Sequence, residues 1–296
     1  MPAVSIIIPS YESHDTLADC LDGLRRQTFR DFEVIVVDSS ADGRGRAILA
    51  RYPEVRLIRS EHRLLPFAAR TLGFRSAKGD VLVSTDPDLL FPPDWLERLV
   101  NRHREAGFAV TGGVTCFGAR LFEWGVHFCK YHESLPSKPA GPAALAASAN
   151  MLLTREMLEA VDDVPVDAYC SDYLFTRTLV GCGFTLWFEP DAWVNHHHIT
   201  SWKEYVAERF IRGVDFGRMR AEREKWSRWR ILLWLLISIF PVRLVRLLAG
   251  TARSARRGHV LGKYLSALPV VAVGFSAWLA GEARAYAAGL RRPRPR

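Results

Sequence analysis

The sequence predicts an α/β fold, in which helices flank a mostly parallel sheet of the nucleotide-binding kind, followed by a C-terminal helical extension. Short apolar runs alternate with amphipathic stretches over the first hundred residues, which is typical of parallel strands joined by helices. Residues 201–296 contain 20 Lys and Arg against 6 Asp and Glu, whereas residues 1–200 contain 20 against 26. We therefore expect an α/β domain that carries the catalytic site at 1–200, and a basic, apolar helical region at 201–296.

The individual elements follow from local patterns. Val4–Ile8 is a continuous apolar-rich run, as expected for a strand buried on both faces, and the apolar spacing after Thr16 indicates a helix. Further strands are expected at 33–37, 55–58, 81–84, near 110, and at 148–153, 184–188 and 192–195. Further helices are expected at 64–77, from about 93, and at 154–160, 172–180 and 205–230. Gly and Pro are scattered through 112–147, which is expected to be irregular.

Polar side chains follow the ends of the expected strands. They are Tyr11, Glu12, Asp38, Ser39, Asp86 and Asp88. In a sheet of this kind ligands bind beyond the carboxyl ends of the strands, so these side chains should gather at one edge. The pattern predicts a single binding edge without any reference to a known family.

Asp86-Pro87-Asp88 is the strongest candidate for chemistry. Two carboxylates at i and i+2 after a buried strand can approach one cation, and hard oxygen ligands suit Mg²⁺ or Mn²⁺. Such an ion would neutralise charge on a departing diphosphate. The alternative is a helix cap or turn, where Asp is common. The first strand is followed by neither G-x-G-x-x-G nor a P-loop, which argues against dinucleotide-binding and P-loop folds.

Three segments resemble the family 2 glycosyltransferases. They are Val4–Glu12 (VSIIIPSYE), Val34–Ser40 (VIVVDSS) and Ala77–Asp88 (AKGDVLVSTDPD). This resemblance covers roughly residues 3–200 and implies an inverting enzyme with the glycosyltransferase-A fold. It implies that Pro9, Tyr11, Glu12, Asp38 and Ser39 surround the nucleotide base and ribose, and that Asp86 and Asp88 serve the diphosphate and metal. Arg70 is a candidate donor contact, whereas Thr71 stands where members often have Asn.

The resemblance also implies a general base. In the family this is commonly the Asp of a Glu-Asp pair that opens a helix, and the matching place here is Ser171-Asp172, with Ser in place of Glu. Asp172 would take the proton from the acceptor hydroxyl as it attacks the anomeric carbon. A helix cap is the alternative role for Asp172. Asp162, Asp163 and Asp167 are fallback candidates for the base.

His196-His197-His198 follows the last expected strand. Alternate residues of a strand point the same way, so His196 and His198 could face one site while His197 faces away. A histidine here resembles the distal metal or diphosphate ligand of some members of this fold. Histidines of an exposed or partly buried loop are the alternative.

The basic extension carries two apolar runs, Ile231–Phe240 and Tyr264–Gly281. The first is too short to span a bilayer and the second is marginal. Basic residues flank both runs on every side, and such charge belongs on the cytoplasmic side of a membrane. We therefore expect helices that lie in, or re-enter, an anionic membrane surface, with Trp234 and Trp278 as anchors. A two-helix span and a buried helical subdomain are the alternatives.

Together these patterns predict an enzyme at the cytoplasmic face of the cell membrane, working in polysaccharide or cell-envelope biosynthesis. The five scattered cysteines agree with a reducing compartment. The predicted partners are a nucleotide diphosphate sugar donor and a lipid-linked or growing glycan acceptor, with no nucleic acid. A polyprenyl-phosphate glycosyltransferase is one alternative. A non-catalytic assembly subunit that binds nucleotide sugars is another, and a basic nucleic-acid binder is a third.

Overall fold

A computed structural model describes residues 1–161, 164 and 167–291 of the chain. Contacts divide these residues into two compact units. The first comprises 1–117 and 134–197, and the second comprises 118–133 and 198–296, of which 292–296 lie outside the described residues. The segment 118–133 therefore groups with the C-terminal part. The assignment of catalysis to 1–200 and of membrane association to 201–296 stays a prediction.

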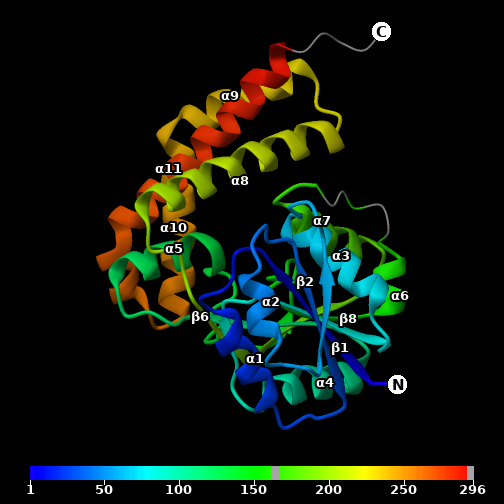
Figure 1. The fold of residues 1–296 in the computed structure, drawn as a ribbon. Helices are drawn as coiled ribbons and strands as arrows, with labels where there is room; N and C mark the ends of the chain where they lie inside the picture. The colour runs from blue at the N-terminus through cyan, green and yellow to red at the C-terminus, as the bar shows by residue number, and fades with distance from the viewer. Residues whose placement is uncertain (162–163, 165–166, 292–296) are drawn as a thin grey trace. The chain divides into compact units, whose positions relative to one another are not determined.

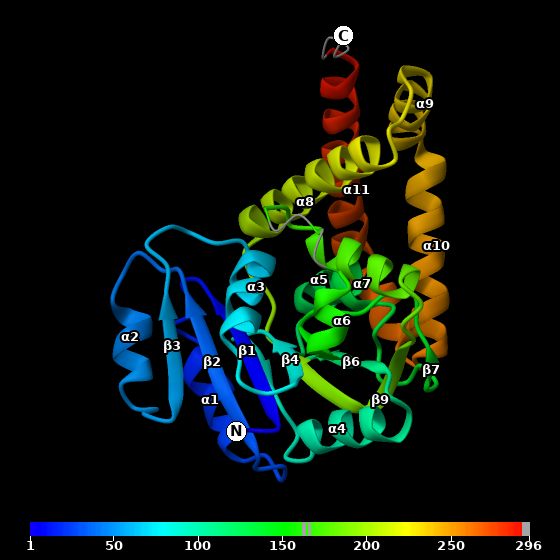
Figure 2. The ribbon, with the colours of Figure 1, turned by 90° about the vertical axis from the view of Figure 1, so that its right-hand side faces the viewer.

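The first unit is built on a nine-stranded sheet, shown in Figures 1 and 2. Eight strands run in the order β3-β2-β1-β4-β8-β6-β9-β5, and β7 pairs with β9. The strands are β1 (Val4–Ser10), β2 (Phe32–Asp38), β3 (Val55–Arg59), β4 (Val81–Thr85), β5 (Leu89–Leu90), β6 (Ala109–Cys116), β7 (Gly141–Pro142), β8 (Asn150–Thr154) and β9 (Leu186–His196). The first four strands of that order pair in parallel, while β8 runs antiparallel to both β4 and β6.

Helices flank this sheet, which confirms the predicted fold class. In the first unit they are α1 (Leu17–Arg25), α2 (Arg44–Leu49), α3 (Pro66–Ser76), α4 (Trp95–Ala106), α6 (Arg155–Glu159) and α7 (Ser171–Gly181). All seven residues of β1 are buried, as expected for a central strand covered on both faces. A Cβ on Gly73 would come within 2.5 Å of Ile7 Cγ2, so only glycine allows α3 to pack this closely on β1.

Two predictions about secondary structure need correction. The expected strands at 184–188 and 192–195 are one continuous strand, β9. The segment 112–147 was expected to be irregular, yet it contains most of β6 and the helix α5 (Leu121–Tyr131). A Cβ on Gly125 would meet Val270 Cβ at 2.4 Å, so this glycine permits close packing of α5 on a helix that is distant in sequence. Tertiary packing stabilises α5 where the local sequence signal is weak.

The second unit is helical. Besides α5 it contains α8 (Trp202–Arg223), α9 (Arg228–Ile239), α10 (Pro241–Arg257) and α11 (Leu261–Arg291). Helix α11 packs against each of the other four. At Gly213 of α8, an added Cβ would lie only 2.1 Å from the Trp278 carbonyl oxygen, so the α8 and α11 backbones nearly touch.

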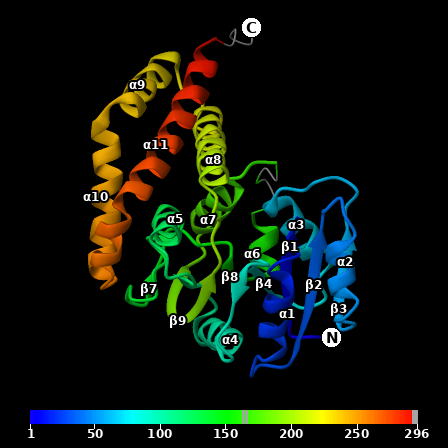
Figure 3. The same cartoon turned by 60° about the vertical axis from the view of Figure 1, so that its left-hand side comes forward.

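The predicted membrane-associated extension contains one helix of suitable length and composition to cross a bilayer. This helix is α11, and 44% of its apolar window is buried inside the structure. Helices α9 and α10 pass the same test only as a pair, and this pair is bent by 67°. Figure 3 shows the bend between α9 and α10, with α11 running beside them.

Candidate active site

The register of the sheet brings the acidic triplet next to a histidine. Strand β4 delivers Asp86, and the short strand β5 begins directly after Asp88. Leu89 of β5 pairs with His196 at the end of β9, and the His197 amide donates to the Asp88 carbonyl oxygen at 2.9 Å. These backbone pairings place the His196 ring beside the two carboxylates, although more than a hundred residues separate them in sequence.

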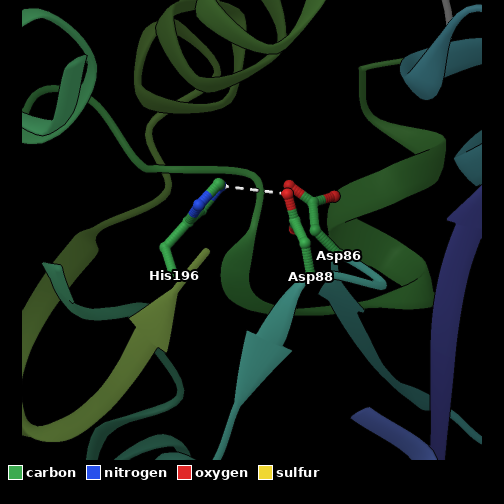
Figure 4. A group of neighbouring side chains, drawn as sticks. All are labelled: Asp86, Asp88 and His196. Carbon is green, nitrogen blue, oxygen red and sulfur yellow. Dashed lines mark ion pairs between the residues drawn. The ribbon is translucent and has the colours of Figure 1, made fainter. Parts of the chain in front are cut away.

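Asp86, Asp88 and His196 form a group that fits a divalent cation, as Figure 4 shows. Their candidate ligand atoms all lie within 4.8 Å of one another, and His196 Nε2 lies 3.6 Å from Asp88 Oδ2. Two ligands about 2.1 Å from one ion are about 3.0 Å apart at right angles and about 4.2 Å apart when opposite. The 3.6 Å between His196 Nε2 and Asp88 Oδ2 falls between these limits. Two carboxylates and an imidazole with this spacing suit Mg²⁺ or Mn²⁺.

Asp86 also forms a buried ion pair. Arg70 projects from α3, is only 3% exposed, and donates from Nη2 to Asp86 Oδ1. The Arg70 Nε has no hydrogen-bond partner among the described residues. Arg70 thus engages one oxygen of Asp86 and leaves the other open to a cation. Which of the two acids ligates a metal directly stays a prediction, with Asp88 expected.

A pocket of about 250 Å³ lies against this group. Its walls come from the end of β1 and the residues after it, from the start of α3 and the loop before it, from the acidic triplet and from the segment ahead of α7. The lining residues are Pro9, Ser10, Tyr11, Ser13, Arg63, Leu64, Leu65, Pro66, Ala69, Asp86, Pro87, Asp88 and Tyr169. The guanidinium carbon of Arg63 lies 4.2 Å from the centre of the Tyr11 ring. The pocket thus has a wall formed by the Arg63 guanidinium and the Tyr11 ring, and the carboxylates of the candidate metal site lie at its other side.

The other predicted nucleotide residues are held by a hydrogen-bond network beyond β1 and β2. Asp38 Oδ1 accepts from Ser40 Oγ at 2.7 Å and from the Ser40 amide at 3.2 Å. The same hydroxyl accepts from the Glu12 amide at 2.7 Å. Glu12 has φ of 52°, in the left-handed region that is costly for this residue type. The network therefore holds Asp38 rigidly and stabilises an unusual backbone conformation at Glu12.

Asp172 lies in the first turn of α7. The N-cap position of this helix is Cys170, and no side chain caps the helix from there. The catalytic role of Asp172 and its capping alternative both stay predictions. Its Oδ2 accepts from Ser148 Oγ at 3.2 Å, and its Oδ1 accepts from the Tyr173 amide at 2.8 Å. Of the fallback candidates, Asp167 is exposed, and Asp162 and Asp163 lie outside the described residues.

The two predicted histidine ligands are placed differently. His196 belongs to the first unit and joins the acids, whereas His198 belongs to the second unit. His198 Nε2 lies 3.0 Å from His127 Nδ1, which is also in the second unit. A metal-binding role for His198 stays a prediction. His197 packs on Phe117, with ring centres 4.1 Å apart.

Sequence reasoning missed three residues of this region, Ser40, Arg63 and Ser148. Each contacts a predicted residue through its side chain: Ser40 contacts Asp38, Arg63 contacts Tyr11, and Ser148 contacts Asp172. Cys20 is fully buried beside the acidic triplet. Burial, followed by the charges of Asp88 and Asp86, raises the pKa of this thiol well above its usual value. A protonated thiol is a poor metal ligand, and Cys20 Sγ donates instead to the Asp86 carbonyl oxygen.

Comparisons with known proteins agree with this geometry. The model of the glycosyl transferase family 2 matches residues 5–161, more than half of the chain. Glycosyltransferase AglE of Haloferax volcanii is 24% identical over 256 residues, covering 81% of this chain and 82% of its own. An undecaprenyl-phosphate 4-deoxy-4-formamido-L-arabinose transferase of Pseudomonas fluorescens is 33% identical over 120 residues, covering 38% and 35%.

Two further proteins extend the likeness. A dolichol-phosphate mannosyltransferase of Pyrococcus furiosus is 27% identical over 185 residues, covering 55% of this chain and 49% of its own. The mannosyltransferase PcManGT of Pyrobaculum calidifontis, solved in complex with GDP-Man and Mn²⁺, matches with a TM-score of 0.58 at 19% identity. That match covers 91% of this chain and 87% of the other, and it shows the shared glycosyltransferase-A fold. The chain is therefore a glycosyltransferase that belongs to family 2.

Proposed function

We propose that this enzyme transfers a sugar, with inversion at the anomeric carbon, from a nucleotide diphosphate sugar to a lipid-linked or growing glycan acceptor. The observation that carries the proposal is the pocket beyond β1 and β4, where Tyr11 and Arg63 face the same space as Asp86 and Asp88. A pocket with a cationic aromatic wall and a metal-competent end suits a nucleotide joined to a diphosphate.

Within the donor site, each group of residues would have a separate task. Asp38, fixed by Ser40, would accept hydrogen bonds from the base, and Tyr11 and Glu12 would border the base and ribose. Asp88 and His196 would hold Mg²⁺ or Mn²⁺, and Asp86 would be oriented by Arg70. When bound, such an ion neutralises negative charge on the leaving diphosphate.

The acceptor side would depend on Asp172. As the acceptor oxygen forms its bond to the anomeric carbon, the bond from that carbon to the diphosphate oxygen breaks, and the diphosphate leaves with the electron pair. Asp172 would take the acceptor proton, which requires an ionised and oriented carboxylate. Its hydrogen bonds from Ser148 and from the Tyr173 amide would orient the carboxylate.

We place this reaction at the cytoplasmic face of a membrane, in polysaccharide or cell-envelope biosynthesis. The apolar helix α11 and the basic helices of the second unit support association with an anionic bilayer. Two relatives are named for undecaprenyl-phosphate and dolichol-phosphate, which supports a lipid-linked acceptor.

The test is a donor panel. The purified enzyme is incubated with common nucleotide sugars and with Mn²⁺, Mg²⁺ or a chelator, and release of nucleoside diphosphate is measured. We expect release from one or few donors, dependent on the added ion, and strongly reduced in Asp88→Asn. Asp31→Asn is the matched control, because Asp31 is an exposed carboxylate outside the pocket. Release that is equal with and without metal would contradict the proposed role of the acids.

A second candidate is direct transfer to a polyprenyl phosphate, which the same two relatives favour by name. A phosphate acceptor is already ionised at neutral pH and needs no strong base. Undiminished transfer by Asp172→Asn to a polyprenyl phosphate would select this candidate. Loss of transfer to a hydroxyl acceptor, with donor binding retained, would select the glycan acceptor instead.

A further inference from the structure

The segment that contains α9 and α10 has an unusual distribution of charge. Residues 225–281 include nine Lys and Arg and no Asp or Glu. Basic side chains at the start of α9 and at the end of α10 are exposed: Arg228, Arg230, Arg253, Arg256 and Arg257. A surface of this charge is complementary to anionic lipid headgroups.

Exposed apolar side chains gather at the bend between these two helices. Ile239 is 66% exposed, Phe240 61%, Val242 62% and Val245 60%. They surround Pro241, which begins α10, while the exposed arginines stand at the far ends of the two helices. We call the bend at Pro241 the apex and the two helices the arms. Apolar side chains at the apex and basic side chains at both arm ends suit a wedge that enters lipid at its bend.

One arginine near the apex is neutralised inside the unit. Arg243 donates to both oxygens of Glu282 of α11, at 2.5 and 2.7 Å, and Glu282 is fully buried. Trp278 Nε1 and Tyr286 OH donate to the same carboxylate at 2.5 and 3.1 Å. This pairing removes the charge that would oppose insertion and also holds α10 against α11. Arg246, farther along α10, is exposed and long enough to reach headgroups.

The dimensions of the bent pair limit how deep it can reach. Arg230 and Arg253 lie ten and thirteen residues from Phe240, which is about 15 and 20 Å along a helix. With both arms inclined equally about the 67° bend, the apex lies about 8–11 Å below the arm ends. That depth matches interfacial helices and is far less than the ~30 Å hydrocarbon core.

We propose that α9 and α10 form a wedge that inserts its bend into one leaflet of an anionic bilayer, with the arginines of both arms at the headgroups. The proposal rests on the membrane association of the proposed function and names the surface responsible. In this proposal the exposed residues of the bend take the anchoring role that the sequence analysis expected of Trp234 and Trp278. Trp278 bonds to Glu282 and Trp234 stacks on Trp226, with ring centres 5.6 Å apart, whereas Trp229 is 74% exposed.

Insertion is tested by site-specific labelling of the full chain. In a Cys182→Ser background, which removes the one exposed cysteine, an environment-sensitive fluorophore is attached at Phe240→Cys, Arg253→Cys or Leu72→Cys. The protein is added to vesicles of phosphatidylcholine mixed with phosphatidylglycerol, with nitroxide groups placed shallow or deep in the acyl chains. We expect quenching of the Phe240→Cys label by shallow nitroxides, a headgroup-level signal at Arg253→Cys, and none at Leu72→Cys.

Two results would overturn the wedge. One is a Phe240→Cys label that stays in water, and the other is a label that a quencher sealed inside the vesicles can reach. Flotation gives an independent measurement, because Phe240→Glu should lower vesicle binding about tenfold or more, whereas Leu72→Glu should not. Equal binding to vesicles of phosphatidylcholine alone would also contradict the proposal. None of these measurements requires sugar transfer. The wedge and the enzymatic proposal can therefore be tested, and can fail, independently of each other.

Discussion

Ser148 Oγ donates to Asp172 Oδ2 at 3.2 Å, and this bond connects the sheet to the candidate base. Ser148 precedes β8, and its carbonyl oxygen accepts from Ser84 Oγ at 2.5 Å. Ser84 lies in β4, the strand that delivers Asp86. A short chain of hydrogen bonds therefore links the strand of the metal-competent acids to the helix of the candidate base. Such a link would hold the candidate base at a fixed position relative to the candidate metal site.

Replacing Ser148 should impair catalysis without affecting donor binding. A hydrogen bond to a charged group contributes about 1.5–3 kcal/mol, so Ser148→Ala should lower kcat about tenfold or more. The KM for the donor should stay unchanged, because Ser148 contacts the candidate base and does not line the pocket. Ser148→Thr should restore most of the activity. Ser171→Ala is the control, since Ser171 Oγ donates to Ala168 and not to Asp172. An equal loss of kcat in that variant would argue against positioning by Ser148.

The metal group makes a prediction about affinity. Asp88→Asn and His196→Gln should each weaken Mn²⁺ binding by tenfold or more, measured by calorimetry or by the electron paramagnetic resonance of free Mn²⁺. Asp31→Asn should bind as the wild type does. His198→Gln separates the two predicted histidines, because its ring lies in the second unit next to His127. Weakening by His198→Gln alone would reverse the assignment made here.

The Arg70 pair predicts a non-additive pattern of stability. Arg70→Met removes the partner of a largely buried carboxylate, so unfolding should become easier by about 2–4 kcal/mol. The double variant Arg70→Met/Asp86→Asn should be more stable than Arg70→Met, because the uncompensated charge is gone. Denaturant unfolding measures both. Additive losses would show that the pair contributes little beyond packing.

The Arg243–Glu282 pair should be essential to the second unit. Glu282→Gln leaves Arg243, whose side chain is only 15% exposed, without its counter-charge, with an expected loss of about 3–5 kcal/mol. The control is Glu61→Gln, since Glu61 is exposed in the first unit. Thermal unfolding in detergent should separate the two variants clearly. Equal melting temperatures would contradict the structural role of the pair.

His132 should make stability depend on pH. Burial, only partly offset by Glu133, lowers the pKa of His132 below its usual value. The unfolded chain therefore binds a proton that the folded chain resists, and stability should fall as the pH drops below about 6.5. The difference between wild type and His132→Gln should shrink in that range. A difference that stays constant from neutral pH to pH 5 would contradict the shift.

Much of the first unit could be predicted from sequence because its signals are local. Continuous apolar runs such as Val4–Ile8 mark central strands, and polar residues after them mark the binding edge. The pairing of Leu89 with His196, by contrast, is set by sheet register between distant strands. Strand alternation and a resemblance pointed to His196 and His198 together, and neither could separate the two histidines.

The rest depended on tertiary contacts. Helix α5 was missed because close packing at Gly125 stabilises it, and nothing near Gly125 in sequence indicates that contact. Ser148 could not be predicted as a partner of Asp172, because 24 residues separate them in sequence. In the extension, composition predicted membrane association, but the bend between α9 and α10 and the burial of Glu282 could be seen only in the fold.

In the proposed donor site, a divalent ion at Asp88 and His196 would join a nucleoside diphosphate to the pocket. Calorimetric titration of GDP and UDP into the full chain, with and without Mn²⁺, tests it most directly. We predict that at least one nucleotide binds at least tenfold more tightly with Mn²⁺, and that Asp88→Asn abolishes this gain while Asp31→Asn retains it. Binding that is unaffected by Mn²⁺, or a gain that survives in Asp88→Asn, would contradict the account.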